Sequence, residues 1–177
     1  MIFSAGLEIA KEIRSEDRAT SMGAFAKLGH GIARNEPIPE LVKKDIIQNT
    51  WQRLVAAANK HNEPGKFTTF AAYEWTYGAS KSHIHRNVFF RDMVVPDYPI
   101  SALEANNENA LWASLEQYTK GGSTVLAIPH NSNLSRGFAF SDKKQDGSPI
   151  DKTYVEQANK YEPLVEIFQA KGNSEVH

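Results

Sequence analysis

Apolar positions recur along residues 40–60 with the spacing of a helix that buries one face. Val42, Ile46, Trp51 and Leu54 belong to this stripe, and lysine, glutamine and arginine fill the opposite face. Pro64 and Gly65 predict where the helix stops. Similar but shorter patterns predict helices over 109–118 and 151–161, and a helix in two pieces over 7–33. The segment 35–40 holds two prolines and predicts a connector.

A second pattern predicts strands. Residues 67–75 and 87–92 are rich in β-branched and aromatic residues, and we expect them to pair as an antiparallel hairpin. The continuous apolar run over 124–130 is typical of a buried parallel strand, and 164–169 predicts another strand. Because strands and helices alternate, the pattern favours an α/β fold with mostly parallel strands. We expect a single domain over 1–177, with a helical segment over 1–39 and an α/β core over 40–177.

Composition narrows the possible functions. The 177 residues are 41% hydrophobic and 23% charged, as in an ordinary globular protein, and the formal net charge is −1. The sequence has no excess of basic residues, which would predict binding to nucleic acid or to an anionic membrane. We expect a soluble chain, because the sequence has neither a membrane-length apolar run nor a signal-peptide pattern; its cellular location stays open. With no cysteine, any metal ion must be held by His, Asp, Glu or water.

Three ligand-type residues fall where predicted strands end or begin. Glu74 closes one strand, His130 closes another, and His85 precedes the second strand of the hairpin. Because side chains alternate along a strand, His83, His85 and Asn87 would share one face, and Arg86 would point the other way. One glutamate and two histidines can hold zinc, manganese or iron. Equally, Glu74 could be a solvated carboxylate and the histidine pair an exposed hairpin tip.

Four stretches also resemble successive motifs of a known family. They are "GKFTTFAAYEWTYG", "HIHRNVFFRD", "LAIPHNSNLSRG" and "EPLVEIFQAKGNSEVH". Together they resemble a bacterial family of unknown function (domain of unknown function 3604). That family is related to the PHP (polymerase and histidinol phosphatase) superfamily of metal-dependent phosphoesterases. The resemblance implies a partial, distorted (β/α) barrel of PHP type.

The resemblance also assigns roles to residues. It implies that Glu74, His85 and His130 are metal ligands, with Glu74 and His130 catalytic, and that Arg86, Asn131 and Asn133 bind substrate. The substrate would be a small ester or phosphoester attacked by a metal-activated water. The cofactor would be a divalent cation, zinc, manganese or iron, or none in this chain alone.

The chain also departs from the family pattern. An upstream His-x-His motif and a downstream Asp-x-His motif are absent at the expected places, so the sequence reads as the middle of a longer protein. We therefore expect weak or no catalysis from this chain, and self-association through unpaired sheet edges. The alternative is a non-catalytic α/β module that binds a metal or small ligand.

Overall fold

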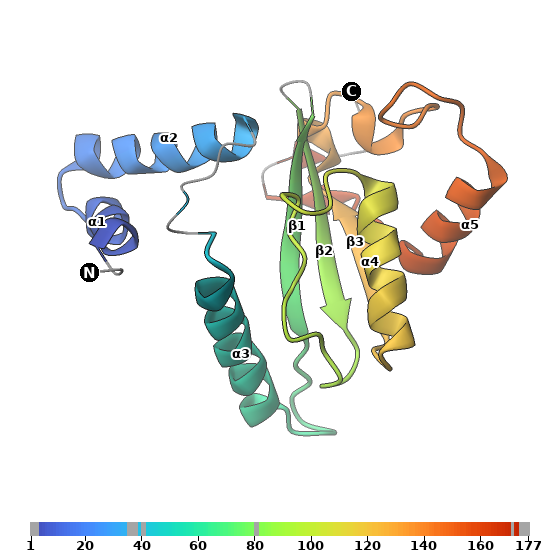
Figure 1. Ribbon diagram of the computed structural model, residues 1–177, viewed down its shortest axis with the longest axis horizontal. Coiled ribbons are helices and arrows are strands. Elements are labelled where there is room, and N and C mark those ends of the chain that lie inside the picture. The colour runs from blue at the N-terminus through green and yellow to red at the C-terminus, as the bar shows by residue number, and fades with distance from the viewer. Residues whose placement is uncertain (1–3, 35–38, 40–41, 80–81, 171, 174–177) are drawn as a thin grey trace.

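Three helices precede the first strand of the protein. The computed structural model describes residues 4–34, 39, 42–79, 82–170 and 172–173. The helices are α1 (Ser4–Ile13), α2 (Arg18–Arg34) and α3 (Lys44–His61), close to the ranges that the apolar spacing predicts. α1 and α2 lie together at one side of the molecule, beyond β1 (Figure 1). Apart from Pro39, the predicted connector over 35–40 lies outside the described residues.

A three-stranded antiparallel sheet forms the centre of the fold. β1 (Ala71–Ala79) pairs with β2 (Ser82–Phe90), and β2 pairs with β3 (Val125–His130), in the order β1-β2-β3. The predicted hairpin is therefore present. The prediction of mostly parallel strands in a PHP-type barrel is wrong, because both strand pairs are antiparallel and the sheet is open.

The path of the chain between β2 and β3 explains why these two strands are antiparallel. A single helix between two strands returns the chain to the starting end of the sheet and makes the strands parallel. Here residues 91–107 first run back along the sheet as an extended segment, and α4 (Glu108–Lys120) then reverses direction once more (Figure 1). β3 consequently starts beside the end of β2, where Arg91 N–H donates to Thr124 O at 2.9 Å.

Short elements complete the C-terminal part of the described chain. They are the 3-10 turns η1 (Ser132–Leu134) and η2 (Phe138–Phe140), the helix α5 (Lys152–Tyr161), and β4 (Phe168–Gln169) paired with β5 (Gly172–Asn173). The strand predicted over 164–169 is thus reduced to its last two residues. Glu166 N–H still donates to Pro129 O at 3.0 Å, which ties the preceding segment to the end of β3.

One face of the sheet packs against helices to form the core. Side chains of β2 alternate strictly between buried and half-buried, as expected for a strand with one covered face. Trp51 of α3, Trp75 of β1 and Trp112 of α4 are at most 3% exposed, and each indole N–H finds an oxygen acceptor. The prediction that Trp51 lies on the buried face of its helix is confirmed. Within the described ranges, no helix combines the length and apolar character needed to cross a membrane.

Candidate metal centre

The sheet face opposite the core carries a cluster of ligand-type side chains. In the β2–β3 register His85 lies directly across from His130, and in the β1–β2 register it lies across from Thr76. Glu74, two residues before Thr76, shares this face because side chains alternate with period two. Three neighbouring strands therefore each contribute at least one polar group to the same small area.

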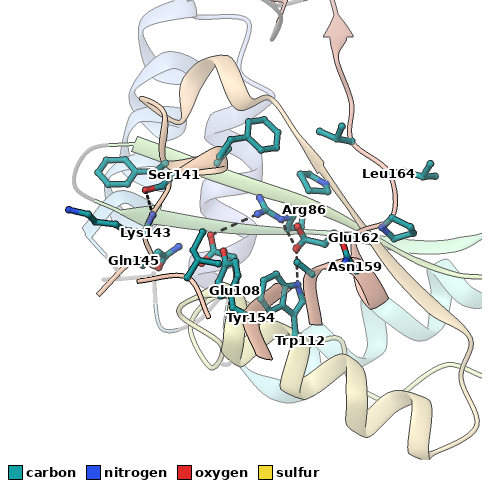
Figure 2. A pocket seen from close by; sticks show the side chains of 18 residues that line it. Arg86, Glu108, Trp112, Ser141, Lys143, Gln145, Tyr154, Asn159, Glu162 and Leu164 are labelled. Atoms are coloured by element: carbon teal, nitrogen blue, oxygen red, sulfur yellow. Dashed lines mark hydrogen bonds and ion pairs between the residues drawn. The ribbon is translucent and has the colours of Figure 1, made fainter. Parts of the chain in front are cut away.

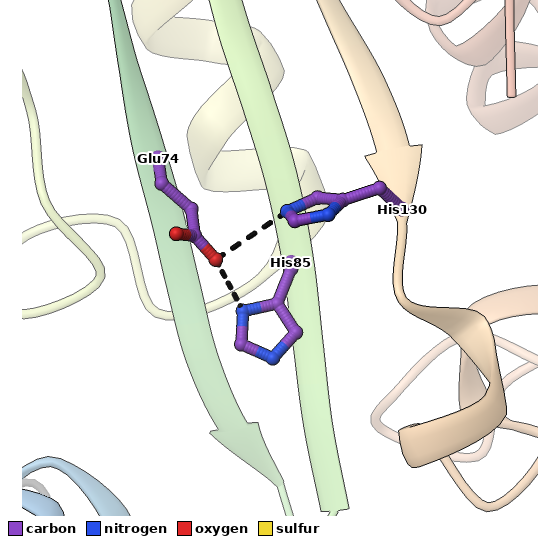
Figure 3. A group of neighbouring side chains, drawn as sticks. All are labelled: Glu74, His85 and His130. Carbon is purple, nitrogen blue, oxygen red and sulfur yellow. Dashed lines mark ion pairs between the residues drawn. The ribbon is translucent and has the colours of Figure 1, made fainter. Parts of the chain in front are cut away.

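The three side chains converge closely (Figure 3). Glu74 Oε1 lies 2.8 Å from His85 Nδ1 and 3.3 Å from His130 Nε2. Each residue offers one ligand atom, and these atoms all lie within 4.8 Å of one another. Both imidazoles are 12% exposed and the Glu74 side chain is 48% exposed, so the cluster opens to solvent on the glutamate side.

Burial favours the neutral form of the His85 imidazole. Desolvation lowers its pKa, and the nearby His130 and His83 lower it further, although the Glu74 carboxylate partly opposes them. A neutral imidazole retains a lone pair, which metal coordination requires. Thr76 Oγ1 lies 3.0 Å from His85 Nδ1 and donates to Glu74 Oε1 at 3.3 Å, so Thr76 helps to orient both side chains.

His130 holds a buried nitrogen without a hydrogen-bond partner. Its Nε2 is shielded from solvent and, despite the 3.3 Å separation from Glu74 Oε1, completes no hydrogen bond. Buried polar atoms are normally paired, because leaving one unpaired costs free energy. A cation between Glu74, His85 and His130 would supply that partner, so the donor set fits a divalent metal such as zinc, manganese or iron.

A second group of side chains surrounds His130. Glu166 Oε2 lies 3.7 Å from His130 Nδ1 and accepts hydrogen bonds from Asn131 N–H and Gln169 Nε2. Gln169 Nε2 also donates to Asn131 Oδ1 at 2.9 Å. Asn131 adopts a left-handed φ of 59°, which asparagine tolerates better than most residues, and it is 3% exposed. Its amide is thus tied to Gln169 at a chain reversal.

Two residues predicted to bind substrate lie away from the three-residue cluster. Asn133 is exposed on η1, where its amide lies close to Gly172. Arg86 is on the opposite, packed face of the sheet and is 2% exposed. The alternation of β2 places Arg86 there, so Arg86 lies away from Glu74, His85 and His130, and its role in substrate binding stays a prediction.

Arg86 instead forms a buried charged group beside a cavity of about 350 Å³ (Figure 2). Its Nε donates to Glu162 Oε1 at 2.9 Å, and its Nη2 lies 3.8 Å from Glu108 Oε1. Trp112 Nε1 donates to the same Glu162 oxygen at 2.8 Å. Burial raises the pKa of Glu108, and the Arg86 charge offsets part of that effect.

Sequence reasoning gave no role to three residues of the site. Thr76 lies two positions after Glu74, so period-two alternation alone could have placed it on the same face. Glu166 and Gln169 reach the cluster from a segment that follows α5, and no local pattern signals that contact. His83 stacks on His85 with ring centroids 5.8 Å apart but stays outside the three-residue group.

Fold and site together define a mixed α/β protein with a Glu-His-His candidate metal centre on an antiparallel sheet. Over residues 4–177 the chain matches the family described as protein of unknown function (DUF3604), and it belongs to that family. No curated protein and no solved structure matches the chain.

Proposed function

We propose that Glu74, His85 and His130 hold a divalent cation. We also propose that the protein functions as a metal-dependent hydrolase, with a phosphoester or related ester as its substrate. The observation that carries the proposal is the convergence of three ligand atoms within 4.8 Å around the unpaired His130 Nε2. The four sequence motifs support the proposal, because the family that they resemble is related to PHP-type phosphoesterases. This support concerns the residues of the site and does not depend on the direction of the strands.

The proposal gives each part of the site a task. A bound divalent cation would polarise the ester and activate a water for attack. His85 and His130 would bind through neutral nitrogens, and Glu74 would bring the negative charge that favours a cation. Glu166, beside His130 Nδ1, would orient that imidazole, as carboxylates commonly do behind metal-binding histidines.

Hydrolysis of bis(4-nitrophenyl) phosphate by manganese- or zinc-loaded protein tests this proposal. We expect slow hydrolysis by the unaltered chain, as its missing motifs predict, and no rate above background in His130→Ala, because losing even an outer partner of a metal ligand costs about 10- to 100-fold. His83→Ala is the matched control, since His83 lies on the same face and strand but outside the cluster. Equal rates in His130→Ala and the parent chain would contradict the proposal.

One alternative remains specific enough to test in the same assay. A non-catalytic module would bind metal through the same three residues without turnover. The absence of the upstream His-x-His and downstream Asp-x-His motifs at the expected places favours this reading, because a two-metal hydrolytic centre needs more ligands than the three that the described residues supply. Metal uptake with no release of 4-nitrophenol by the parent chain would support the binding module over the enzyme.

A further inference from the structure

A cavity of about 430 Å³ lies along the outer edge of β1 and reaches the candidate metal centre. We call it the β1-edge cavity. Glu74 and Thr76 form one of its walls, and the start of α3 and the segment 101–106 form the others. Its volume lies within the range of small-molecule sites, about 300–1,000 Å³. A molecule in this cavity would therefore touch the same carboxylate that takes part in the Glu-His-His cluster.

The lining of this cavity is mostly apolar and carries no positive charge in the part of the chain that the structure describes. Its apolar members are Val42, Ile47, Ala102 and Leu103. The other contributors include the uncharged polar residues Thr76, Ser101 and Asn106, and no lysine or arginine lines it. Sites that hold phosphate groups normally use arginine, lysine or a helix N-terminus to neutralise the charge.

Two charged side chains close to the lining do not offer a positive charge to the cavity. The Lys44 ammonium, at the start of α3, lies 5.6 Å from the centroid of the Tyr98 ring. Glu104 accepts hydrogen bonds from Ser101 and Tyr98. Although burial raises the pKa of Glu104, these hydrogen bonds outweigh it and leave the pKa below its usual value. An ionised carboxylate beside the cavity would repel an anionic substituent.

We infer that the β1-edge cavity binds an uncharged, apolar substituent of the ester whose reacting group lies at Glu74, His85 and His130. This inference rests on the proposed function, and it narrows the substrate class. The substrate would be an ester or phosphodiester with an aryl or alkyl group, in contrast to a sugar phosphate with a second charged end.

Hydroxamates test the inference, because they chelate a divalent metal through two oxygens and can carry an apolar group. The probes are acetohydroxamate and benzohydroxamate, titrated by calorimetry into the zinc-loaded chain. Benzohydroxamate should bind about tenfold more tightly, as expected when part of an aromatic ring leaves water. Leu103→Asn should remove that advantage while leaving the affinity for acetohydroxamate unchanged.

Leu164→Asn is the matched control. It makes the same change at an exposed leucine that lines the separate cavity beside Arg86, and the preference for benzohydroxamate should persist. Leu103 is 36% exposed, so Leu103→Asn should leave the fold intact, which circular dichroism checks. As a second measurement on the unaltered chain, nuclear Overhauser effects should connect the benzohydroxamate ring to methyl groups of Val42, Ile47 or Leu103.

The outcomes separate this inference from the proposed function. Equal affinities for the two hydroxamates, or a benzohydroxamate advantage that survives Leu103→Asn, would overturn the substrate assignment while leaving the metal centre in place. Absence of overhauser effects to the three lining residues would overturn it as well. If neither hydroxamate binds the zinc-loaded chain, the proposed function fails and the substrate assignment fails with it.

Discussion

Arg86 and His85 are adjacent in the sequence but contribute to different parts of the structure. It follows His85 directly, yet the alternation of β2 turns it to the packed face, where it meets Glu162 and Glu108. A buried ion pair adds little net stability compared with apolar packing, but removing one partner leaves an uncompensated charge. The structure therefore places Arg86 in the support of the core, separate from the candidate metal centre.

Arg86→Ala should lower the free energy of unfolding by about 3–5 kcal/mol, because Glu162 would lose its closely paired cation in a buried position. Urea denaturation followed by circular dichroism measures this change. Arg91→Ala, at an exposed position just after β2, is the control and should stay within about 0.5 kcal/mol of the parent chain. A loss below about 1 kcal/mol in Arg86→Ala would contradict the structural role.

The direction of a single side chain was predictable where the two-residue period of a strand determines it. Alternation along β2 predicted that His83, His85 and Asn87 share a face and that Arg86 points away, and the structure has this arrangement. The contact between Glu166 and His130 was not predictable, because 36 positions separate them and nothing in the intervening pattern specifies where the chain returns. Asn131 Oδ1 accepts a hydrogen bond from Gln169 Nε2, and the predicted role of Asn131 in substrate binding stays a prediction.

The hairpin and α4 position the site at the scale of elements. β1 and β2 are joined across residues 80–81, a connection too short for any but an antiparallel pairing. That pairing brings Glu74 near His85, and β3 then adds His130 opposite His85. α4 supports the arrangement from the packed face through Leu111, Trp112 and Leu115. The start of α4 consequently matters to the sheet as a whole.

Asn107 caps this helix, since its side-chain oxygen accepts the Ala110 N–H at 2.9 Å. Asn107→Ala should lower the free energy of unfolding by about 1 kcal/mol, the usual cost of losing an N-cap side chain. Asn107→Asp should retain the stability, because aspartate caps equally well. Thermal unfolding of the two variants makes the comparison. Equal melting temperatures for Asn107→Ala and Asn107→Asp would rule out the capping role.

The existence of most elements was predictable, and their directions were not. Apolar spacing located α3, α4 and α5 because each buries one stripe of its surface. The run 124–130 reads as a buried parallel strand, but β3 is antiparallel to β2. The direction is decided by residues 91–107, which run back along the sheet and whose proline-containing sequence specifies no regular element of its own.

At the scale of the molecule, the sheet has one packed face and one open face. The helices α3, α4 and α5 contribute to the core on the first, and the Glu-His-His cluster lies on the second. Exposed apolar side chains such as Phe70 border the open face, where Phe70 packs edge-to-face on Phe89. Self-association of the chain through its sheet edges stays a prediction, which light scattering over a concentration series would check.

Metal binding by Glu74, His85 and His130 can be measured directly, because metal ions can reach the open face of the sheet without unfolding the protein. Calorimetric titration of zinc into the metal-free chain should give saturable binding. His130→Ala should weaken that binding by more than about 100-fold, whereas His83→Ala should change it by less than about threefold, since His83 lies outside the ligand group. Zinc binding that is absent from the parent chain, or equally tight in His130→Ala, would contradict the account.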